Sequence, residues 1–147
     1  MLQVVLVYPE IPPNTGNIAR TCAATNTPLH LVEPLGFEIS DRQLKRAGLD
    51  YWEYVNLQVH PNLEALKQVA TGRLVCFSVY SDRSFRDFQF QAGDWLLFGS
   101  ESKGLPKDLI VQCENVCIPM EHPKVRSLNL SVSAALGLFE ARRQLGL

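Results

Sequence analysis

The sequence has 147 residues, of which 46% are hydrophobic and 20% are charged, and this composition excludes an intrinsically disordered chain. Its length suits one folded domain over residues 1–147. Fourteen Lys and Arg residues oppose fifteen Asp and Glu residues, so the formal net charge is −1. A nearly neutral protein cannot hold a polyanion by its overall charge, so nucleic-acid binding would need a local basic patch or a second subunit.

The pattern of apolar and polar residues predicts strands alternating with helices. The continuous apolar run at residues 4–7 is typical of a strand that is buried on both faces. In chain order, we expect strands at residues 4–7, 29–33, 55–59, 74–79, 95–98 and 116–118, and helices at 14–26, 41–46, 62–70, 106–112 and 129–144. Asn14 or Thr15, Ser40 or Asp41, and Asn62 are the predicted helix caps.

This alternation predicts the α/β class, with a mostly parallel sheet and helices on both of its faces. Ligands bind such sheets at the carboxyl ends of the strands. We therefore expect functional residues in the loops that follow residues 7, 79, 98 and 118.

The first of these loops reads PEIPPNTGNIAR over residues 9–20. Gly16 would permit close backbone approach at a helix N-terminus, where free N–H groups favour an anion. Arg20 lies one turn into that helix and suits a phosphate partner. A proline-rich turn with a surface arginine is the alternative interpretation.

The loop at residues 98–106 reads FGSESKGLP, and its two glycines let the backbone pass close to a ligand. It is neither the dinucleotide fingerprint nor a P-loop. Glu101 would place a carboxylate at the end of a strand. A plain strand–turn–helix link with a solvated Glu101 explains the same residues.

The third segment has more helix-capping residues than one helix end uses. Ser127, Asn129 and Ser131 are all residue types that cap helices. The polar side chains that do not cap the helix could line a pocket. The alternative is a well-capped helix that follows an exposed basic loop. His122 is interpreted as a surface residue, because no nucleophile is paired with it by spacing.

The cysteines and the ends of the chain indicate a cytoplasmic protein with no membrane partner. The apolar run at residues 1–8 lacks the preceding basic residue of a secretory signal, and no segment has the length of a membrane helix. The four cysteines, Cys22, Cys76, Cys113 and Cys117, form no C-x-x-C pair and are interpreted as reduced thiols. Cys113, Cys117 and His122 leave a metal site one ligand short, so we expect no metal.

Taken together, the loops resemble the SPOUT superfamily of S-adenosylmethionine-dependent RNA 2′-O-ribose methyltransferases, and within it the small TrmL type. The resemblance covers essentially the whole chain. The motifs that carry it are PEIPPNTGNIAR (9–20), HLVEPLGF (30–37), RAGLDY (46–51), LLFGSESKGLP (96–106) and IPMEHPKVRSLNLS (118–131).

The resemblance implies a homodimer with a deep C-terminal trefoil knot that holds S-adenosylmethionine without a metal. It implies methylation of the ribose 2′-hydroxyl of the wobble nucleotide, a cytidine or a modified uridine, in leucine tRNAs. The catalytic residues that it implies are Arg20, Asn14, Glu101 and Asn129. The cofactor-binding residues that it implies are Phe77, Ser78, Gly99, Ile118, Ser127 and Leu128.

Contacts with RNA are expected from two groups of basic residues. These are Arg42, Lys45 and Arg46 in the predicted short helix, and Lys124 and Arg126 in the third loop. A solvated helix face is the alternative interpretation of the first group.

This chain departs from the TrmL type at two positions. Lys103 stands where Arg is common, and Phe139 stands where the last helix often has a tyrosine. The tRNA assignment is weakened by the missing hydroxyl more than the reaction type is.

Three other functions fit parts of this pattern. A related 2′-O-methyltransferase could act on another tRNA position or on ribosomal RNA. A non-catalytic RNA- or nucleotide-binding module is disfavoured by the intact Asn14, Arg20, Glu101 and Asn129. An unrelated nucleotide-binding α/β protein is disfavoured because neither common phosphate fingerprint is present.

Overall fold

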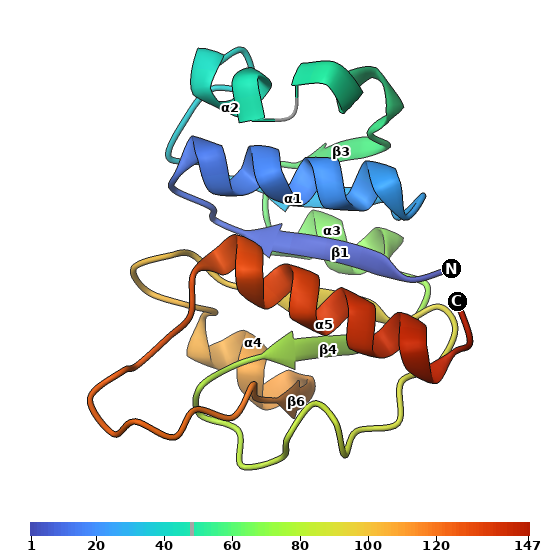
Figure 1. Cartoon of the computed structure of the whole chain (residues 1–147), viewed down its shortest axis with the longest axis vertical. Coiled ribbons are helices and arrows are strands. Elements are labelled where there is room, and N and C mark those ends of the chain that lie inside the picture. Colours follow the sequence, from blue (N-terminus) through green and yellow to red (C-terminus); the bar gives the residue numbers. More distant parts are fainter. Residues whose placement is uncertain (48) are drawn as a thin grey trace.

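The computed structural model describes residues 1–47 and 49–147, and within them the chain builds one parallel sheet of six strands (Figure 1). The strands are β1 (Gln3–Val7), β2 (Leu29–Val32), β3 (Leu57–His60), β4 (Leu74–Phe77), β5 (Trp95–Phe98) and β6 (Glu114–Val116). The helices are α1 (Pro12–Ala24), α2 (Arg42–Ala47), the 3-10 helix η1 (Leu49–Tyr54), α3 (Leu63–Val69), α4 (Lys107–Gln112) and α5 (Leu130–Gln144).

The strands lie in the order β3-β2-β1-β5-β4-β6, and every neighbouring pair is parallel. Side chains of α1 and α5 form one core cluster with Val4 and Leu6, and both helices lie across that face of the sheet in Figure 1. Side chains of α3 and α4 form a second cluster with Val5 and Val7. The predicted α/β class with helices on both faces is therefore confirmed.

The central strands are apolar throughout because both of their faces are covered. Successive residues of β5 point to opposite clusters, with Leu96 and Phe98 in one and Trp95 and Leu97 in the other. Each of these side chains is at most 5% exposed. Burying each one contributes roughly 1.5–3 kcal/mol, so the middle of the sheet anchors the loops at its carboxyl edge.

Several predicted elements are confirmed at their boundaries, and others shift. The strand predicted at 95–98 is β5. Asn129 caps α5, Asn62 caps α3, and Asp41 Oδ1 accepts hydrogen bonds from backbone N–H groups of α2. The last strand lies at 114–116 rather than 116–118. Val55, predicted to begin a strand, lies outside β3.

The first helix begins at Pro12, two residues earlier than predicted, so Asn14 and Thr15 are not its caps. Proline suits the first turn of a helix because it has no N–H to leave unpaired. The two prolines also remove two of the free donors that an anion would use at this end. The expected anion site at Gly16 is wrong, because Gly16 lies buried inside α1 against α2.

The connection between β4 and β5, residues 78–94, packs three aromatic side chains into the core. Phe85, Phe88 and Phe90 join the cluster that contains α5. Cys117 N donates to Arg83 O, and Phe85 N donates to Cys117 O, both at 2.8 Å. The chain that leaves β6 therefore runs beside this connection on its way to α5.

In the part of the chain that the structure describes, no helix is both long enough and apolar enough to cross a membrane.

Candidate functional site at the carboxyl edge of β1 and β5

The chain leaves the neighbouring strands β1 and β5 toward opposite faces of the sheet. α1 follows β1 and packs in the first core cluster, whereas α4 follows β5 and packs in the second. Such a point in a parallel sheet separates the two following loops and leaves a crevice that commonly binds ligands. The loops that meet here are residues 8–11 and 99–106.

The Glu101 carboxylate joins these two loops. It accepts hydrogen bonds from Glu10 N and Ile11 N, both at 2.8 Å. It also accepts one from Asn14 Nδ2 at 3.1 Å. The N-cap residue of α1 is Ile11, whose side chain has no hydrogen-bond acceptor, so the Glu101 carboxylate from the other loop binds this end of the helix instead.

Asn14 extends the network to the start of α5. Its side-chain oxygen accepts a hydrogen bond from Asn129 Nδ2 at 3.1 Å. The Asn129 side-chain oxygen in turn accepts from Ser131 N at 2.8 Å, and this bond caps α5. Three of the four predicted catalytic residues, Asn14, Glu101 and Asn129, thus form one oriented chain of hydrogen bonds.

The loop that carries Glu101 is tightly folded. Ser100 and Gly104 exchange two backbone hydrogen bonds of 3.2 and 2.9 Å. A side chain at Gly99 would collide with the backbone of Gly104 and Leu105, and Gly104 itself has a φ of +67°. Both glycines are therefore required by the turn.

A second link ties the same two loops together. Glu10 Oε1 accepts from the Ser102 hydroxyl at 2.6 Å and from Ser102 N at 3.2 Å. These hydrogen bonds lower the pKa of Glu10. The carboxylate therefore stays ionised at neutral pH.

Arg20 lies outside this network within its own chain. It follows Asn14 by six residues, which is about 9 Å along the axis of α1, and it points to a different side of the helix. Its exposed guanidinium lies over the ring of Tyr51 in η1, 4.9 Å from the ring centroid. Sequence reasoning missed Tyr51 as the partner of Arg20, although it closes the quoted motif RAGLDY.

Five of the six predicted cofactor residues fall into two groups, and the sixth, Gly99, lies in the tight turn that follows β5. The first is at the end of β4, where the Phe77 ring is stacked on Phe98 with centroids 4.6 Å apart and belongs to the core. Ser78 extends the ladder, since its N–H donates to Val116 O at 2.9 Å. The Phe77 ring is partly buried by this packing, and its backbone lies at the carboxyl end of β4.

The second group is in the segment that leads to α5. Among the described residues, the only backbone–backbone hydrogen bond of residues 118–128 joins Val125 N to His122 O. The backbone groups of Ile118, Ser127 and Leu128 therefore lack partners, and Ser127 and Leu128 are exposed. Free donors and acceptors of this kind fit S-adenosylmethionine, whose adenine and ribose are polar at their edges.

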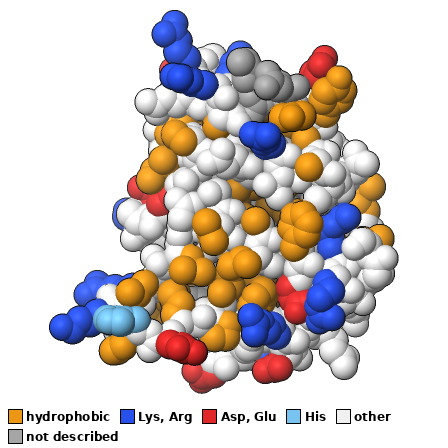
Figure 2. All heavy atoms as spheres, viewed as in Figure 1, with side chains coloured by type: hydrophobic (Ala, Val, Ile, Leu, Met, Phe, Trp, Pro, Cys, Tyr) orange, Lys and Arg blue, Asp and Glu red, His pale blue; other side chains and the backbone are white. Residues whose placement is uncertain are grey.

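The two predicted RNA-binding groups lie far apart in one chain. Arg42, Lys45 and Arg46 are exposed on α2 at one end of the long axis, and the loop with Lys124 and Arg126 projects at the other (Figure 1). On the face that Figure 2 shows, the Lys and Arg side chains at the top and at the bottom left are separated by hydrophobic and other uncharged surface. Among the described residues, no group of three or more His, Cys, Asp and Glu side chains could hold a metal.

In an all-parallel α/β sheet, the loops at the carboxyl edge commonly bind a ligand, and here they carry the polar network. The chain belongs to the SpoU rRNA Methylase family, whose model matches residues 1–139. A relative from Synechocystis sp. is 58% identical over 151 residues, covering 99% of this chain and 97% of its own length. The tRNA (cytidine(34)-2′-O)-methyltransferase of Methylovorus glucosotrophus is 53% identical, with 98% and 96% covered.

Solved structures agree with this assignment. One that describes 2-OH methylation of C/U34 on tRNA has a TM-score of 0.95 and 47% identity, covering 99% of this chain and 97% of its own. The SpoU methyltransferase AviRb from Streptomyces viridochromogenes, in complex with AdoMet, has a TM-score of 0.88 and 26% identity. That match covers 99% of this chain and 58% of AviRb. The predicted membership of the SPOUT methyltransferases is confirmed.

Proposed function

We propose that this protein transfers the methyl group of S-adenosylmethionine to the ribose 2′-hydroxyl of nucleotide 34, a cytidine or a modified uridine, in leucine tRNAs of the cytoplasm. The observation that carries the proposal is the chain of hydrogen bonds from Asn129 through Asn14 to Glu101, beside the open backbone of residues 118–128. Relatives that are about half identical over nearly their whole length are named tRNA (cytidine(34)-2′-O)-methyltransferase, which supports the reaction and the position.

Methyl transfer from a sulfonium is an in-line displacement, so the protein must place the hydroxyl oxygen behind the methyl carbon. When bound, S-adenosylmethionine supplies the methyl group and the charge that drives its loss. The backbone groups of Ile118, Ser127 and Leu128 would hold the adenine and ribose of the cofactor. Glu101 and Asn14 act as positioning residues, and their hydrogen bonds to both loops and to the start of α5 support this role.

The ribose hydroxyl must lose its proton, and an arginine side chain is a poor base because it stays charged. Arg20 instead orients an RNA phosphate that takes up the proton, and its charge stabilises the developing alkoxide. Stacking on Tyr51 restricts the guanidinium to one region of the surface.

A homodimer is part of the proposal, and the surface of α5 supports it. Val132, Leu136 and Phe139 recur at helical spacing on one side of α5 and are 41–53% exposed. Figure 2 shows hydrophobic side chains gathered on this face. Pairing of two copies would cover this stripe. It could also bring Arg20 of the partner subunit to the hydrogen-bond network of Asn14 and Glu101, which Arg20 does not reach within one chain.

The trefoil knot is likewise a proposal. It is supported by the way in which residues 117–118 and α5 run along the β4–β5 connection. Cys117 exchanges two hydrogen bonds with Arg83 and Phe85, and Phe90 N donates to Gln144 Oε1 at 2.9 Å. The C-terminal segment is thus attached to that connection at both of its ends.

The decisive experiment is nucleoside mass spectrometry of tRNA from cells without this protein, complemented by the wild type, by Arg20→Ala or by Lys67→Ala. In cells without the protein, we expect the 2′-O-methyl mark at position 34 of leucine tRNAs to be absent. The wild type should restore this mark, and Arg20→Ala should not. Lys67→Ala, a cation on the opposite face of the sheet, should also restore it. Loss of a mark at another tRNA position or in ribosomal RNA would contradict the substrate assignment.

Purified Arg20→Ala should bind S-adenosylmethionine with unchanged affinity in calorimetry, while its turnover falls at least about 100-fold. Normal turnover of this variant would remove Arg20 from the mechanism. Cofactor binding by the wild type without any methyl transfer would favour the RNA-binding module instead.

A further inference from the structure

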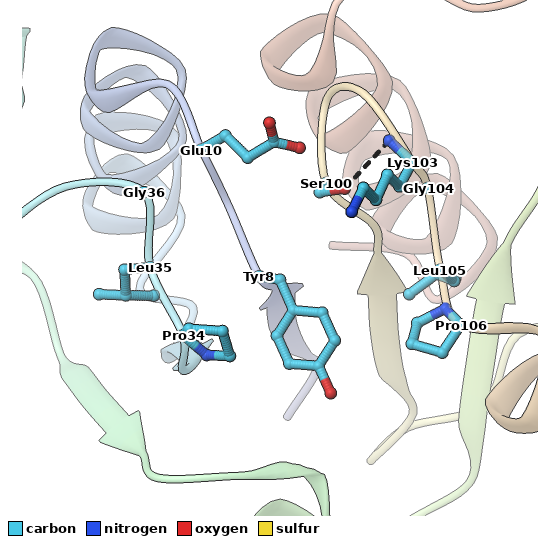
Figure 3. Close-up of a pocket in the computed structure, with 10 residues that line it drawn as sticks. All are labelled: Tyr8, Glu10, Pro34, Leu35, Gly36, Ser100, Lys103, Gly104, Leu105 and Pro106. Carbon is cyan, nitrogen blue, oxygen red and sulfur yellow. Dashed lines mark hydrogen bonds between the residues drawn. The ribbon is translucent and has the colours of Figure 1, made fainter.

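A cavity of about 520 Å³ opens at the carboxyl ends of β1, β2 and β5, next to the Glu101 network (Figure 3). Its lining residues come from three loops: Tyr8, Glu10, Pro34, Leu35, Gly36, Ser100, Lys103, Gly104, Leu105 and Pro106. None of the six predicted cofactor-binding residues lines it. The cavity has the size of sites that take one small organic group, and the mechanism above leaves it without a role.

Tyr8 is held in an unfavourable backbone conformation at this cavity. Its φ is +58°, in the left-handed region that bulky residues seldom adopt. Tyr8 N still donates to Val32 O at 3.1 Å, so the strain occurs where the β ladder ends. Strain of this kind is concentrated at functional sites, and here it sets an aromatic ring in the middle of the cavity.

The walls combine apolar surfaces with two opposite charges. Figure 3 shows the Tyr8 ring between Pro34 and Leu35 on one side and Leu105 and Pro106 on the other. Glu10 and Lys103 lie together at one end of the cavity. A flat ring with polar edges matches this arrangement, because its faces can lie against Tyr8 and a proline while its edge meets the charges.

We propose that this cavity binds an unpaired nucleobase of the RNA substrate, next to the nucleotide that is methylated. The proposal rests on the proposed function and adds a base-binding subsite to it. The Glu10 carboxylate can accept a hydrogen bond from an exocyclic amino group of the base, and it repels a phosphate from the interior. Lys103, exposed on the same loop, can meet the phosphate that follows the base.

The position of the cavity fits a neighbour of the reacting nucleotide. Glu10 and the loop at residues 99–106 belong both to the cavity wall and to the network with Asn14. A base bound beside Tyr8 would therefore hold the adjacent ribose near that network. Single-stranded RNA is commonly read in this way, one unstacked base for each aromatic side chain.

The test compares Tyr8→Gly with Tyr8→Phe in the full-length protein. Glycine accepts the positive φ, so Tyr8→Gly removes the ring without straining the backbone, and Tyr8→Phe retains the ring. Because the Tyr8 ring packs against the second core cluster, circular dichroism first checks that Tyr8→Gly is folded. The probe is an anticodon stem-loop RNA with the fluorescent base 2-aminopurine placed directly 5′ or 3′ of the target nucleotide. Fluorescence of the bound RNA, KM for unlabelled RNA, and calorimetric affinity for S-adenosylmethionine are measured.

We expect the wild type and Tyr8→Phe to quench 2-aminopurine at one of the two positions. Tyr8→Gly should lose the quenching and raise KM for RNA about tenfold, with unchanged cofactor affinity. If the wild type methylates the RNA but Tyr8→Gly leaves both the quenching and KM unchanged, the base-binding subsite is wrong and the proposed function stands. If Tyr8→Gly binds S-adenosylmethionine more weakly, the cavity binds the cofactor rather than a base. If the wild type does not bind RNA, both proposals are wrong.

Discussion

At the scale of single residues, the Glu101 carboxylate joins the two loops of the site. Its two carboxylate oxygens accept three hydrogen bonds from residues about 90 positions earlier in the chain. Glu101→Gln replaces one of these acceptors with an NH2 group, which then faces a donor. We expect a loss of about 1–3 kcal/mol in the free energy of unfolding and a lower kcat, measured by urea denaturation and by methyl transfer.

The matched control for that prediction is Glu38→Gln, which changes an exposed carboxylate whose only side-chain hydrogen bond among the described residues comes from Ser40 Oγ at 3.5 Å. It should change neither stability nor turnover. If Glu101→Gln were as stable and active as this control, the network would have no positioning role.

The sequence pointed to Asn14, Glu101 and Asn129 one loop at a time, but it could not show their contacts. Each is a polar residue near the end of a strand or the start of a helix, which local pattern reveals. Their hydrogen bonds join positions 87 and 115 residues apart. Such pairs depend on which strands are neighbours, and a single sequence does not contain that information. The contact of Arg20 with Tyr51 escapes sequence reasoning for the same reason. The positive φ of Tyr8 escapes it because a bulky residue carries no signal for that conformation.

At the scale of elements, the packing of α1 on α2 depends on Gly16. A Cβ there would lie 2.5 Å from Ala47 Cβ and 2.6 Å from Leu44 O, so Gly16→Ala pushes α2 away. We expect a loss of about 1–2 kcal/mol in the free energy of unfolding, because overpacking outweighs the better helix propensity of alanine. RNA affinity should fall as well, since α2 carries one of the two basic groups.

Urea denaturation and fluorescence anisotropy with labelled tRNA check the Gly16→Ala prediction. Asn17→Ala, an exposed change on the next residue of α1, is the control and should leave both measurements unaltered. Equal behaviour of the two variants would show that α2 is not packed against Gly16 in solution.

A pair of buried histidines makes the β2–β3 side of the sheet sensitive to acid. His30 Nε2 lies 2.8 Å from the acceptor Gln3 Oε1, and His30 Nδ1 lies 3.0 Å from His60 Nε2. His30 must therefore donate to Gln3 and accept from His60, and a second proton on its ring would face the His60 N–H. Burial first, and then the charge of His60, lowers the pKa of His30 to about 4.

Because the folded pKa of His30 lies below its ordinary value of 6.5, the unfolded chain binds the proton more readily than the folded chain. The stability is complete above about pH 6.5 and falls as the pH decreases toward 4, by up to about 3 kcal/mol. Urea denaturation at several pH values measures this loss. His30→Gln, which does not titrate at this position, should lose distinctly less stability over that range, and an equal loss would contradict the assignment.

The elements themselves were predicted most accurately where one local signal dominated. The strand at residues 95–98 is apolar throughout and is followed at once by Gly99, and the capping side chain of Asn129 marks the start of α5. The prediction failed where two signals competed, as at Pro12, which was assigned to a loop although proline also opens helices. The 3-10 helix η1 has no comparable signal and was not predicted.

At the scale of the whole molecule, the arrangement of the strands could not be obtained from pattern alone. Alternating strands and helices predict a parallel sheet but not the order β3-β2-β1-β5-β4-β6. That order sets α2 and the loop at residues 118–128 at opposite ends of the molecule (Figure 1). Within one chain, the five basic residues expected to contact RNA therefore lie in two separate places rather than in one patch.

The same reasoning predicts that one active site takes residues from two chains. Arg20→Ala and Asn14→Ala should each lose activity, and alanine suits both positions of α1. If Arg20 of the partner subunit serves the Asn14 network, a mixed dimer of the two variants has one doubly altered site and one intact site. Random mixing by co-expression should then restore about one quarter of wild-type turnover, because half of the dimers are mixed.

Methyl transfer by the co-expressed pair, set against each variant alone, measures this restoration. Leu136→Glu introduced into both variants is the control, because a charge within the exposed stripe of α5 should prevent pairing and abolish the recovery. Light scattering reports the oligomeric state of every sample. If stable dimers gain no activity on mixing, Arg20 and Asn14 act from the same chain. In that case, either α1 would have to rotate or the Arg20 side chain would have to leave the Tyr51 ring before Arg20 and Asn14 could meet.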